Sequence, residues 1–95
     1  MGLINHSTLI FNGAPFQDTY VCISNNVIRV SYQKDVNLYF IEIPYTIYYS
    51  LEARNNQYGP LMNQILTCQT DTFPADLYNY CYQELKTIYT SYSDV

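Results

Sequence analysis

The sequence predicts an α+β fold: a small antiparallel β-meander of three to four strands, followed by three helices packed on one face. Two observations favour this class. Runs of β-branched and aromatic residues, separated by turn-forming residues, fill the first half of the chain. After Pro44, apolar residues recur at helical spacing. The chain has 95 residues, 48% of them hydrophobic, which is enough for one core, so we expect a single domain over residues 1–95.

The expected strands are runs rich in Val, Ile, Thr, Tyr and Phe, and asparagines mark most of the turns between them. Asn-Gly and Asn-Asn tolerate positive φ, which suits the tight turns of β-hairpins. Residues 14–18 are expected to form a loop, in which Pro15 holds the chain extended. The expected turns are Asn12-Gly13, Asn25-Asn26 and residues 34–37. The expected strands are residues 7–11, 19–24, 27–33 and 38–43.

Pro44 is expected to end the sheet, because proline cannot donate to a β-ladder and fits the first turn of a helix. Apolar residues at spacings of three and four then predict two short helices and a longer amphipathic one. The expected helices are residues 45–54, 61–66 and 72–93. The apolar stripe of the third consists of Leu77, Cys81, Leu85, Ile88 and Tyr92.

The composition favours protein partners over nucleic acid. Charged residues make up 13% of the chain, the net charge is −4, and the four cations are scattered. A phosphate backbone is bound mainly through Lys and Arg, so this is a poor electrostatic footprint for DNA or RNA. Twelve tyrosines with so few charges indicate an aromatic surface that binds a partner or a second copy.

No motif predicts catalysis, a cofactor or a metal site. Cys22, Cys68 and Cys81 form no CxxC pair, so we expect buried free thiols, with one disulfide and a leftover thiol as the alternative. His6 is the single histidine, and the sequence places no third group beside it that could orient it as a base. We therefore expect a non-enzymatic protein. Asp76 is expected to complement the dipole of the third helix.

No signal peptide, myristoylation signal or membrane-spanning run is expected. The first residues lack a basic region followed by an apolar run, and no apolar run approaches eighteen residues. We expect an intracellular, soluble protein. The richness in Asn, Tyr and Ile, the small size and the low charge resemble those of small accessory proteins of viruses and mobile elements. The cytoplasm in which we expect the protein therefore includes that of an infected host cell.

The centre of the chain carries a longer pattern. It consists of Ile28-Arg29-Val30-Ser31-Tyr32, then Tyr39-Phe40-Ile41-Glu42-Ile43-Pro44, then Ile47-Tyr48, Leu51, Ala53, Gly59 and Met62-Asn63. This resembles the hairpin-proline-helix pattern of the KTSC domain family, which is named for its occurrence at the C-terminus of some lysyl-tRNA synthetases. The resemblance covers roughly residues 20–66. It implies a KTSC-like core over residues 19–66, with residues 72–93 as an additional C-terminal helix.

The chain departs from the family pattern around Asn63, where basic residues would support a function in binding nucleic acid. The family implies a nucleic-acid role, but the basic residues that flank the corresponding Asn in the family are replaced here by Pro60, Gln64 and Thr67. We therefore expect a module that binds a protein partner or itself through a Tyr-rich surface. A module for RNA or single-stranded DNA, centred on Arg54, Tyr58 and Asn63, is the alternative. The candidate binding residues are Arg54, Tyr58, Asn63, Tyr78, Tyr82 and Tyr89.

Overall fold

The structure, a computed structural model, describes residues 2–24 and 28–95. Over these residues the chain forms eight strands and two helices. The strands are β1 (Leu3–Asn5), β2 (Leu9–Phe11), β3 (Ala14–Phe16), β4 (Thr19–Ile23), β5 (Arg29–Gln33), β6 (Leu38–Tyr48), β7 (Met62–Thr70) and β8 (Tyr92–Asp94). The helices are α1 (Leu51–Asn55) and α2 (Leu77–Lys86). The predicted meander of three to four strands with three helices on one face is therefore wrong, because most of the regular structure is strand.

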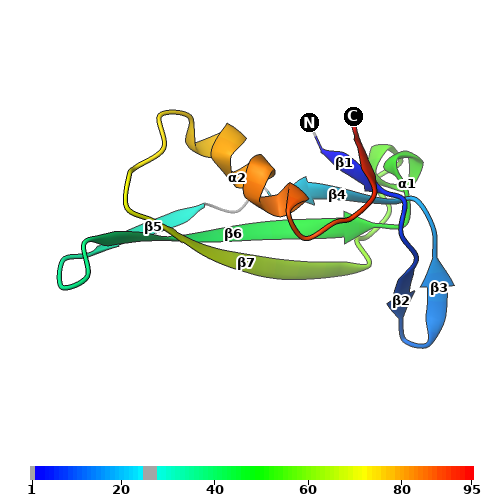
Figure 1. Cartoon of the computed structure of the whole chain (residues 1–95). Coiled ribbons are helices and arrows are strands. Elements are labelled where there is room, and N and C mark those ends of the chain that lie inside the picture. Colours follow the sequence, from blue (N-terminus) through cyan, green and yellow to red (C-terminus); the bar gives the residue numbers. More distant parts are fainter. Residues whose placement is uncertain (1, 25–27) are drawn as a thin grey trace.

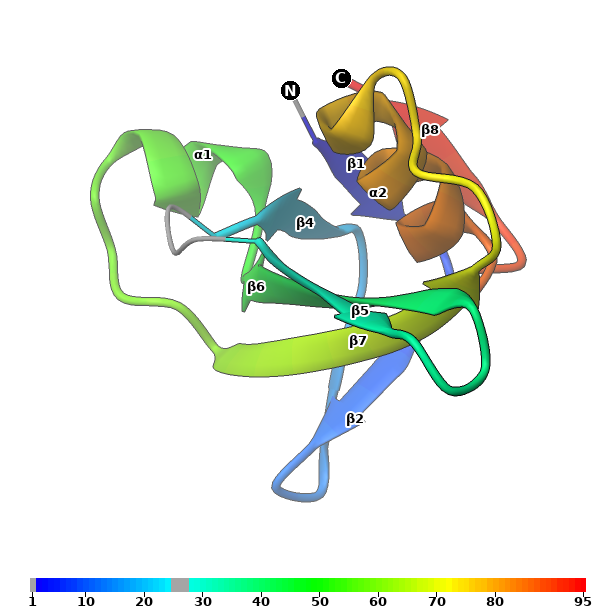
Figure 2. The ribbon, with the colours of Figure 1, turned by 90° about the vertical axis from the view of Figure 1, so that its left-hand side faces the viewer.

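One six-stranded antiparallel sheet forms the body of the molecule, in the order β5-β6-β4-β1-β8, with β7 paired to β6. In Figure 1 the helix α2 lies over one face of this sheet, and the separate β2–β3 hairpin projects past the other. Figure 2 shows that the sheet curves around α2, with β7 on one side of the helix and β8 on the other. The two termini lie side by side, where Gly2 and Val95 exchange backbone hydrogen bonds of 3.2 and 3.1 Å.

Pro44 lies inside β6 and does not end the sheet. The first part of β6 pairs with β5, and the part after Pro44 pairs with β4. The Ser24 amide donates to the Pro44 carbonyl over 2.9 Å, but Pro44 has no N–H to return the bond. The missing donor thus falls where β6 changes partners, which is why the long strand tolerates a proline there.

The predicted helix over residues 45–54 is mostly strand. β6 continues to Tyr48, and α1 begins only at Leu51, after Ser50 caps it by accepting the Ala53 N–H over 3.0 Å. Ile43 and Ile47 are four residues apart, a spacing that fits one face of a strand as well as one face of a helix. Both side chains are buried in the core, so burial in the sheet decides between the two.

The predicted helix over residues 61–66 is also wrong, because this segment is the start of β7. Leu66 and Cys68 pack against the core, while their neighbours Ile65, Thr67 and Gln69 are exposed. This alternation has the two-residue period of a strand. β7 pairs with β6 over nine residues, from Tyr39 opposite Thr70 to Ile47 opposite Met62.

The third predicted helix is confirmed in part. Leu77, Cys81 and Leu85 face the core along α2 as expected. Asp76 caps the helix, because its Oδ1 accepts the Asn79 N–H over 3.1 Å. The helix ends at Lys86 instead of continuing to residue 93, and the following residues form β8, which pairs with β1.

The local turn predictions have separate outcomes. Asn12 (φ 52°) and Gly13 (φ 78°) close the β2–β3 hairpin as predicted, but residues 14–16 form β3 and not a loop. Residues 34–37 turn between β5 and β6 with Asn37 at φ 54°, as expected. The predicted Asn25-Asn26 turn lies outside the described residues.

The core lies between α2 and the concave face of the sheet. All three cysteines are free, as predicted; Cys22 and Cys81 are also buried, whereas Cys68 is only partly buried. No helix in the described part of the chain is long and apolar enough to cross a membrane. The buried cluster consists of Leu3, Val21, Ile23, Ile41, Ile43, Ile47, Cys81, Tyr82 and Leu85.

Candidate interaction surface

The outer edge of β7 is the longest free strand edge among the described residues. β7 pairs with β6 on one side, and no described strand pairs with its other side. Along an antiparallel strand, the backbone N–H and C=O of one residue point to one side, and those of the next residue point to the other side. The Pro44 carbonyl faces β4, so the backbone groups of Ile43 and Tyr45 face β7, where their register partners are Leu66 and Gln64.

The residues between these partners direct their backbone groups outward. They are Asn63, Ile65, Thr67 and Gln69. Each carries one N–H and one C=O that point away from β6, so they form a row of donors and acceptors along the edge. An exposed row of this kind is a template for a further strand.

The composition of β7 leaves this edge unprotected. Its nine residues, MNQILTCQT, contain no charge, no proline and no glycine. Proteins commonly block free edges with lysine, proline or inward-pointing charges, and β7 uses none of these. Ile65, 65% exposed, adds an apolar side chain beside Pro44 on the outer face of the sheet. The edge is therefore suited to pairing with an uncharged strand.

Hydrogen bonds hold the first part of this edge in place. The Thr46 hydroxyl donates to Asn63 Oδ1 over 2.8 Å, and Ser24 Oγ lies 2.6 Å from Thr46 Oγ1. This chain of side chains connects three adjacent strand segments across the outer face. Asn63, a predicted site residue, thus positions the edge through its side chain while its backbone groups point outward.

Arg54 and Tyr78 line a polar cavity of about 130 Å³. The Arg54 guanidinium also lies 6.0 Å from the centre of the Tyr20 ring. Burial raises the pKa of the Cys22 thiol in this cavity, and the charge of Arg54 opposes that rise. The remaining lining residues are Ile23, Ser24, Thr46 and Tyr48.

The other predicted tyrosines lie in different environments. Tyr58 is exposed and lines a shallow hollow of about 410 Å³ beside α1. Tyr82 is 1% exposed, and its hydroxyl accepts the Ile23 N–H over 3.1 Å, so it belongs to the core. Tyr78 packs edge-on against Tyr82 at 5.2 Å between ring centres. Tyr89 is half-buried, and its burial raises the pKa of its phenol.

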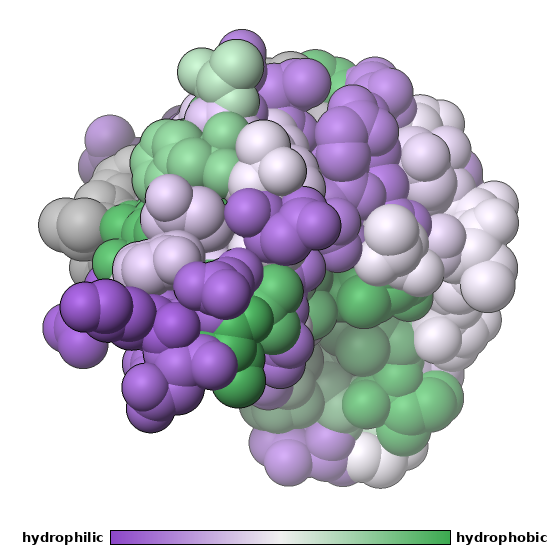
Figure 3. Space-filling view, turned by 60° about the vertical axis from the view of Figure 1, so that its left-hand side comes forward, coloured by the Kyte–Doolittle hydropathy of each residue, from purple (hydrophilic) through white to green (hydrophobic). Residues whose placement is uncertain are grey.

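The six predicted residues therefore do not share one surface. Arg54 and Tyr78 come together at the polar cavity, whereas Tyr82 belongs to the core. Figure 3 shows one face of the molecule, on which apolar residues reach the surface in separate groups between hydrophilic ones. The β7 edge is absent from the predicted site because the apolar pairs of this segment predict a helix. The run of β-formers between Ile65 and Thr70, without a charge, is the signal that indicates it.

An aromatic cluster lies at the far end of the β5–β6 hairpin. Tyr32 and Tyr39 pack with ring centres 4.8 Å apart, and Phe73 meets Tyr39 edge-on at 5.5 Å. The Tyr32 hydroxyl donates to Asn37 Oδ1 over 3.0 Å, so the cluster stiffens the turn. Tyr32 and Phe73 are half-exposed, so this cluster presents aromatic surface near Thr70, the last residue of β7.

A comparison with protein-family models, curated proteins and solved structures finds no match. The resemblance to the KTSC domain family therefore stays a prediction. The described residues also contain no group of three or more His, Cys, Asp or Glu side chains that could hold a metal ion.

Proposed function

We propose that this protein is an interaction module that binds a second copy of itself by pairing its β7 edges. The observation that carries the proposal is the nine-residue uncharged edge of β7, whose outward backbone groups have no partner strand among the described residues. Adding a strand to an exposed edge supplies main-chain hydrogen bonds, while the side chains on each face give specificity.

A second copy fits this edge because the strand complements itself. A two-fold axis through Leu66 places Ile65 opposite Thr67 of the partner, and Asn63 opposite Gln69 of the partner. All four outward residues are then in hydrogen-bonded pairs, each of which exchanges two bonds. No like charges meet, because β7 carries none.

The charges of the described residues favour a protein partner over nucleic acid. Lys86 Nζ is bound to Asp94 Oδ1 at 2.9 Å, and Arg29 lies opposite Glu42 in the sheet register. A nucleic-acid groove combines stacking aromatics with several free cations. Arg54, beside the polar cavity, is a single cation, so it supports the alternative module for RNA or single-stranded DNA only weakly.

Light scattering over a range of concentrations tests the proposal. We expect a mass that approaches twice the 11.1 kDa of the chain as the concentration rises. Ile65→Lys places a charge on the edge and should weaken the association about tenfold or more. Thr67→Pro should do the same, because it removes an outward N–H and leaves the pairing of β7 with β6 intact.

Ile10→Lys is the matched control. Ile10 lies on β2 and is 64% exposed, close to the 65% of Ile65, and the substitution adds the same charge. This variant should keep the wild-type mass. A wild-type protein that stays at 11.1 kDa at every concentration would refute the dimer, and equal weakening by both lysine variants would refute the role of β7.

A further inference from the structure

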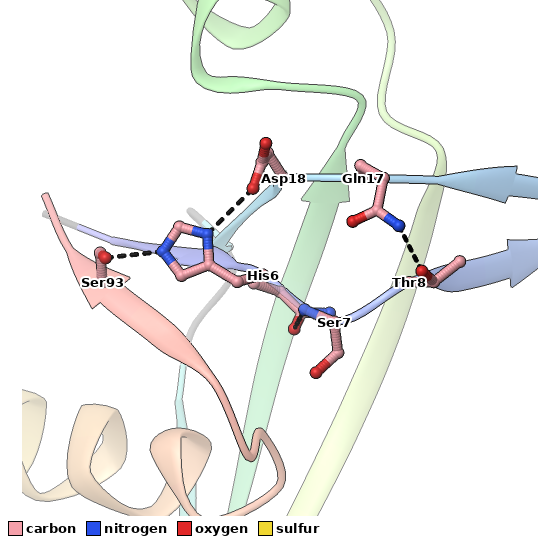
Figure 4. A network of polar contacts seen from close by, with 7 residues as sticks. His6, Ser7, Thr8, Gln17, Asp18 and Ser93 are labelled. Atoms are coloured by element: carbon pink, nitrogen blue, oxygen red, sulfur yellow. Dashed lines mark hydrogen bonds and ion pairs between the residues drawn. The ribbon is translucent and has the colours of Figure 1, made fainter.

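His6 is held between a carboxylate and a hydroxyl that are far from one another in the sequence. Its Nδ1 lies 2.9 Å from Asp18 Oδ1, and its Nε2 lies 2.7 Å from Ser93 Oγ. Figure 4 shows the three side chains in line, with the imidazole ring between the other two. They come from the end of β1, the turn before β4, and β8.

The backbone fixes this arrangement. The His6 amide donates to the Ser91 carbonyl over 2.9 Å, which sets the register of β8 beside β1. Ile4 is therefore opposite Ser93, and the side chains of His6 and Ser93 lie on the same face of the sheet. Asp18 has φ 53°, a left-handed conformation that aspartate adopts more readily than most residues.

The hydrogen bonds determine the tautomer of the imidazole. An ionised carboxylate only accepts, so the proton of a neutral His6 is on Nδ1, where Asp18 accepts it. Nε2 is then unprotonated and accepts the hydroxyl proton of Ser93. A serine, an imidazole and a carboxylate in this order form the arrangement that activates a serine as a nucleophile.

An unused backbone donor follows the serine. Ser91 and Val95 direct their backbone groups to β1, so by alternation the Asp94 N–H points away from β1, and no described residue accepts it. The N–H of the residue after the nucleophile can stabilise a developing oxyanion. The Asp94 carboxylate lies on the opposite face from Ser93 and is bound to Lys86, which keeps its charge away from the hydroxyl.

We propose that Ser93, His6 and Asp18 form a nucleophilic site that accepts an acyl group from small activated esters. Ser93 Oγ attacks the ester carbonyl while its proton passes to His6 Nε2. The bond from the carbonyl carbon to the leaving oxygen then breaks, and that oxygen receives the proton from Nε2. The product is an acylated Ser93, which water hydrolyses by the same route. Asp18 is a positioning residue in this step, because it holds the imidazole without touching the ester.

The exposure of the site limits its substrates. The side chain of His6 is 40% exposed and that of Asp18 is 67% exposed, and neither cavity described above includes them. A site without walls gains little from substrate binding, so the substrate must already carry a good leaving group. The site lies at the β8 edge of the sheet, whereas the proposed dimer uses β7, so the two functions are independent.

Acetylation by p-nitrophenyl acetate tests this inference. With the ester in excess, we expect a rapid phase that releases one equivalent of nitrophenolate per protein chain, and a mass increase of one acetyl group located on Ser93. Ser93→Ala should abolish the rapid phase, whereas Ser91→Ala, a change at a neighbouring exposed serine, should keep it. An acetyl group on another residue of the wild-type protein, or a rapid phase that survives in Ser93→Ala, would overturn the proposal.

Two variants of Asp18 separate positioning of the imidazole from a structural role. Asp18→Asn should slow the acetylation of Ser93 at least tenfold, because the amide can donate to Nδ1 and favour the wrong tautomer. Asp18→Glu keeps the carboxylate and should retain more of the rate. If Asp18 has a purely structural role, Asp18→Asn should retain more of the acetylation rate than Asp18→Glu, since asparagine tolerates the left-handed φ of this position better than glutamate. That order would contradict the role of Asp18.

Discussion

Tyr82 lies in the core, although the sequence places it on the tyrosine-lined flank of a helix. Its neighbours Cys81 and Leu85 are both fully buried, and the ring of Tyr82 lies among them. Its hydroxyl accepts the N–H of Ile23, the last residue of β4, which lies beyond the pairing of β4 with β1 and which a shorter side chain would leave without this partner. Twelve tyrosines thus do not make twelve surface residues, because some of them supply hydrogen bonds inside the core.

Removing this hydroxyl should destabilise the fold. Tyr82→Phe leaves the buried Ile23 N–H without its acceptor, which should cost about 1–3 kcal/mol of the free energy of unfolding. Urea unfolding followed by circular dichroism measures it. Tyr58→Phe is the control, since Tyr58 is 62% exposed and lies outside the core, and it should change stability by less than about 0.5 kcal/mol. Equal losses in the two variants would show that the Ile23 hydrogen bond contributes little.

Single residues also show what local sequence can predict. Asn12-Gly13 was predicted correctly as a turn, because positive φ at both positions is a property of these two residues themselves. His6 and Ser93 are 87 positions apart and meet only because β8 pairs with β1. No periodicity or spacing in the sequence records such a contact, so the Ser93–His6–Asp18 arrangement could not be predicted.

At the scale of the elements, the errors have one physical cause. Ile43 and Ile47 in β6, and Met62 and Leu66 in β7, are pairs spaced by four residues, which line one face of either a helix or a strand. In both segments the choice is made by a partner strand, since β6 and β7 pair with one another over nine residues. α2 was predicted correctly over Leu77–Lys86, because the predicted stripe also contains a step of three residues, from Leu85 to Ile88, which one face of a strand does not allow.

The N-cap of α2 should contribute measurably to stability. Asp76→Ala leaves the Asn79 N–H without its cap and should reduce the free energy of unfolding by about 1 kcal/mol. Asp71→Ala removes the same charge from the preceding exposed loop and is the matched control. Urea unfolding of both variants provides the comparison. A loss as large in Asp71→Ala would attribute the effect to net charge and not to the cap.

At the scale of the whole molecule, the free edges of the sheet differ in length and charge. The molecule is elongated, 44 × 23 × 23 Å, and among the described residues the sheet ends in β7 on one side of β6 and in β5 and β8 on the other. β5 is five residues long and carries the charge of Arg29. β8 is three residues long and carries the Asp94–Lys86 ion pair. β7 is three times longer and uncharged. Because charge and shortness protect an edge, β7 is the edge through which this molecule should associate.

Hydrogen exchange at the individual amides of β7 is the most direct test of this account. In dilute protein, the outward amides of Asn63, Ile65, Thr67 and Gln69 should exchange fast, and those of Leu66 and Cys68, which are bonded to β6, should be protected. At concentrations where the mass doubles, the outward amides should become protected as well. A doubled mass with outward amides that still exchange fast would place the interface elsewhere and contradict the pairing of β7 edges.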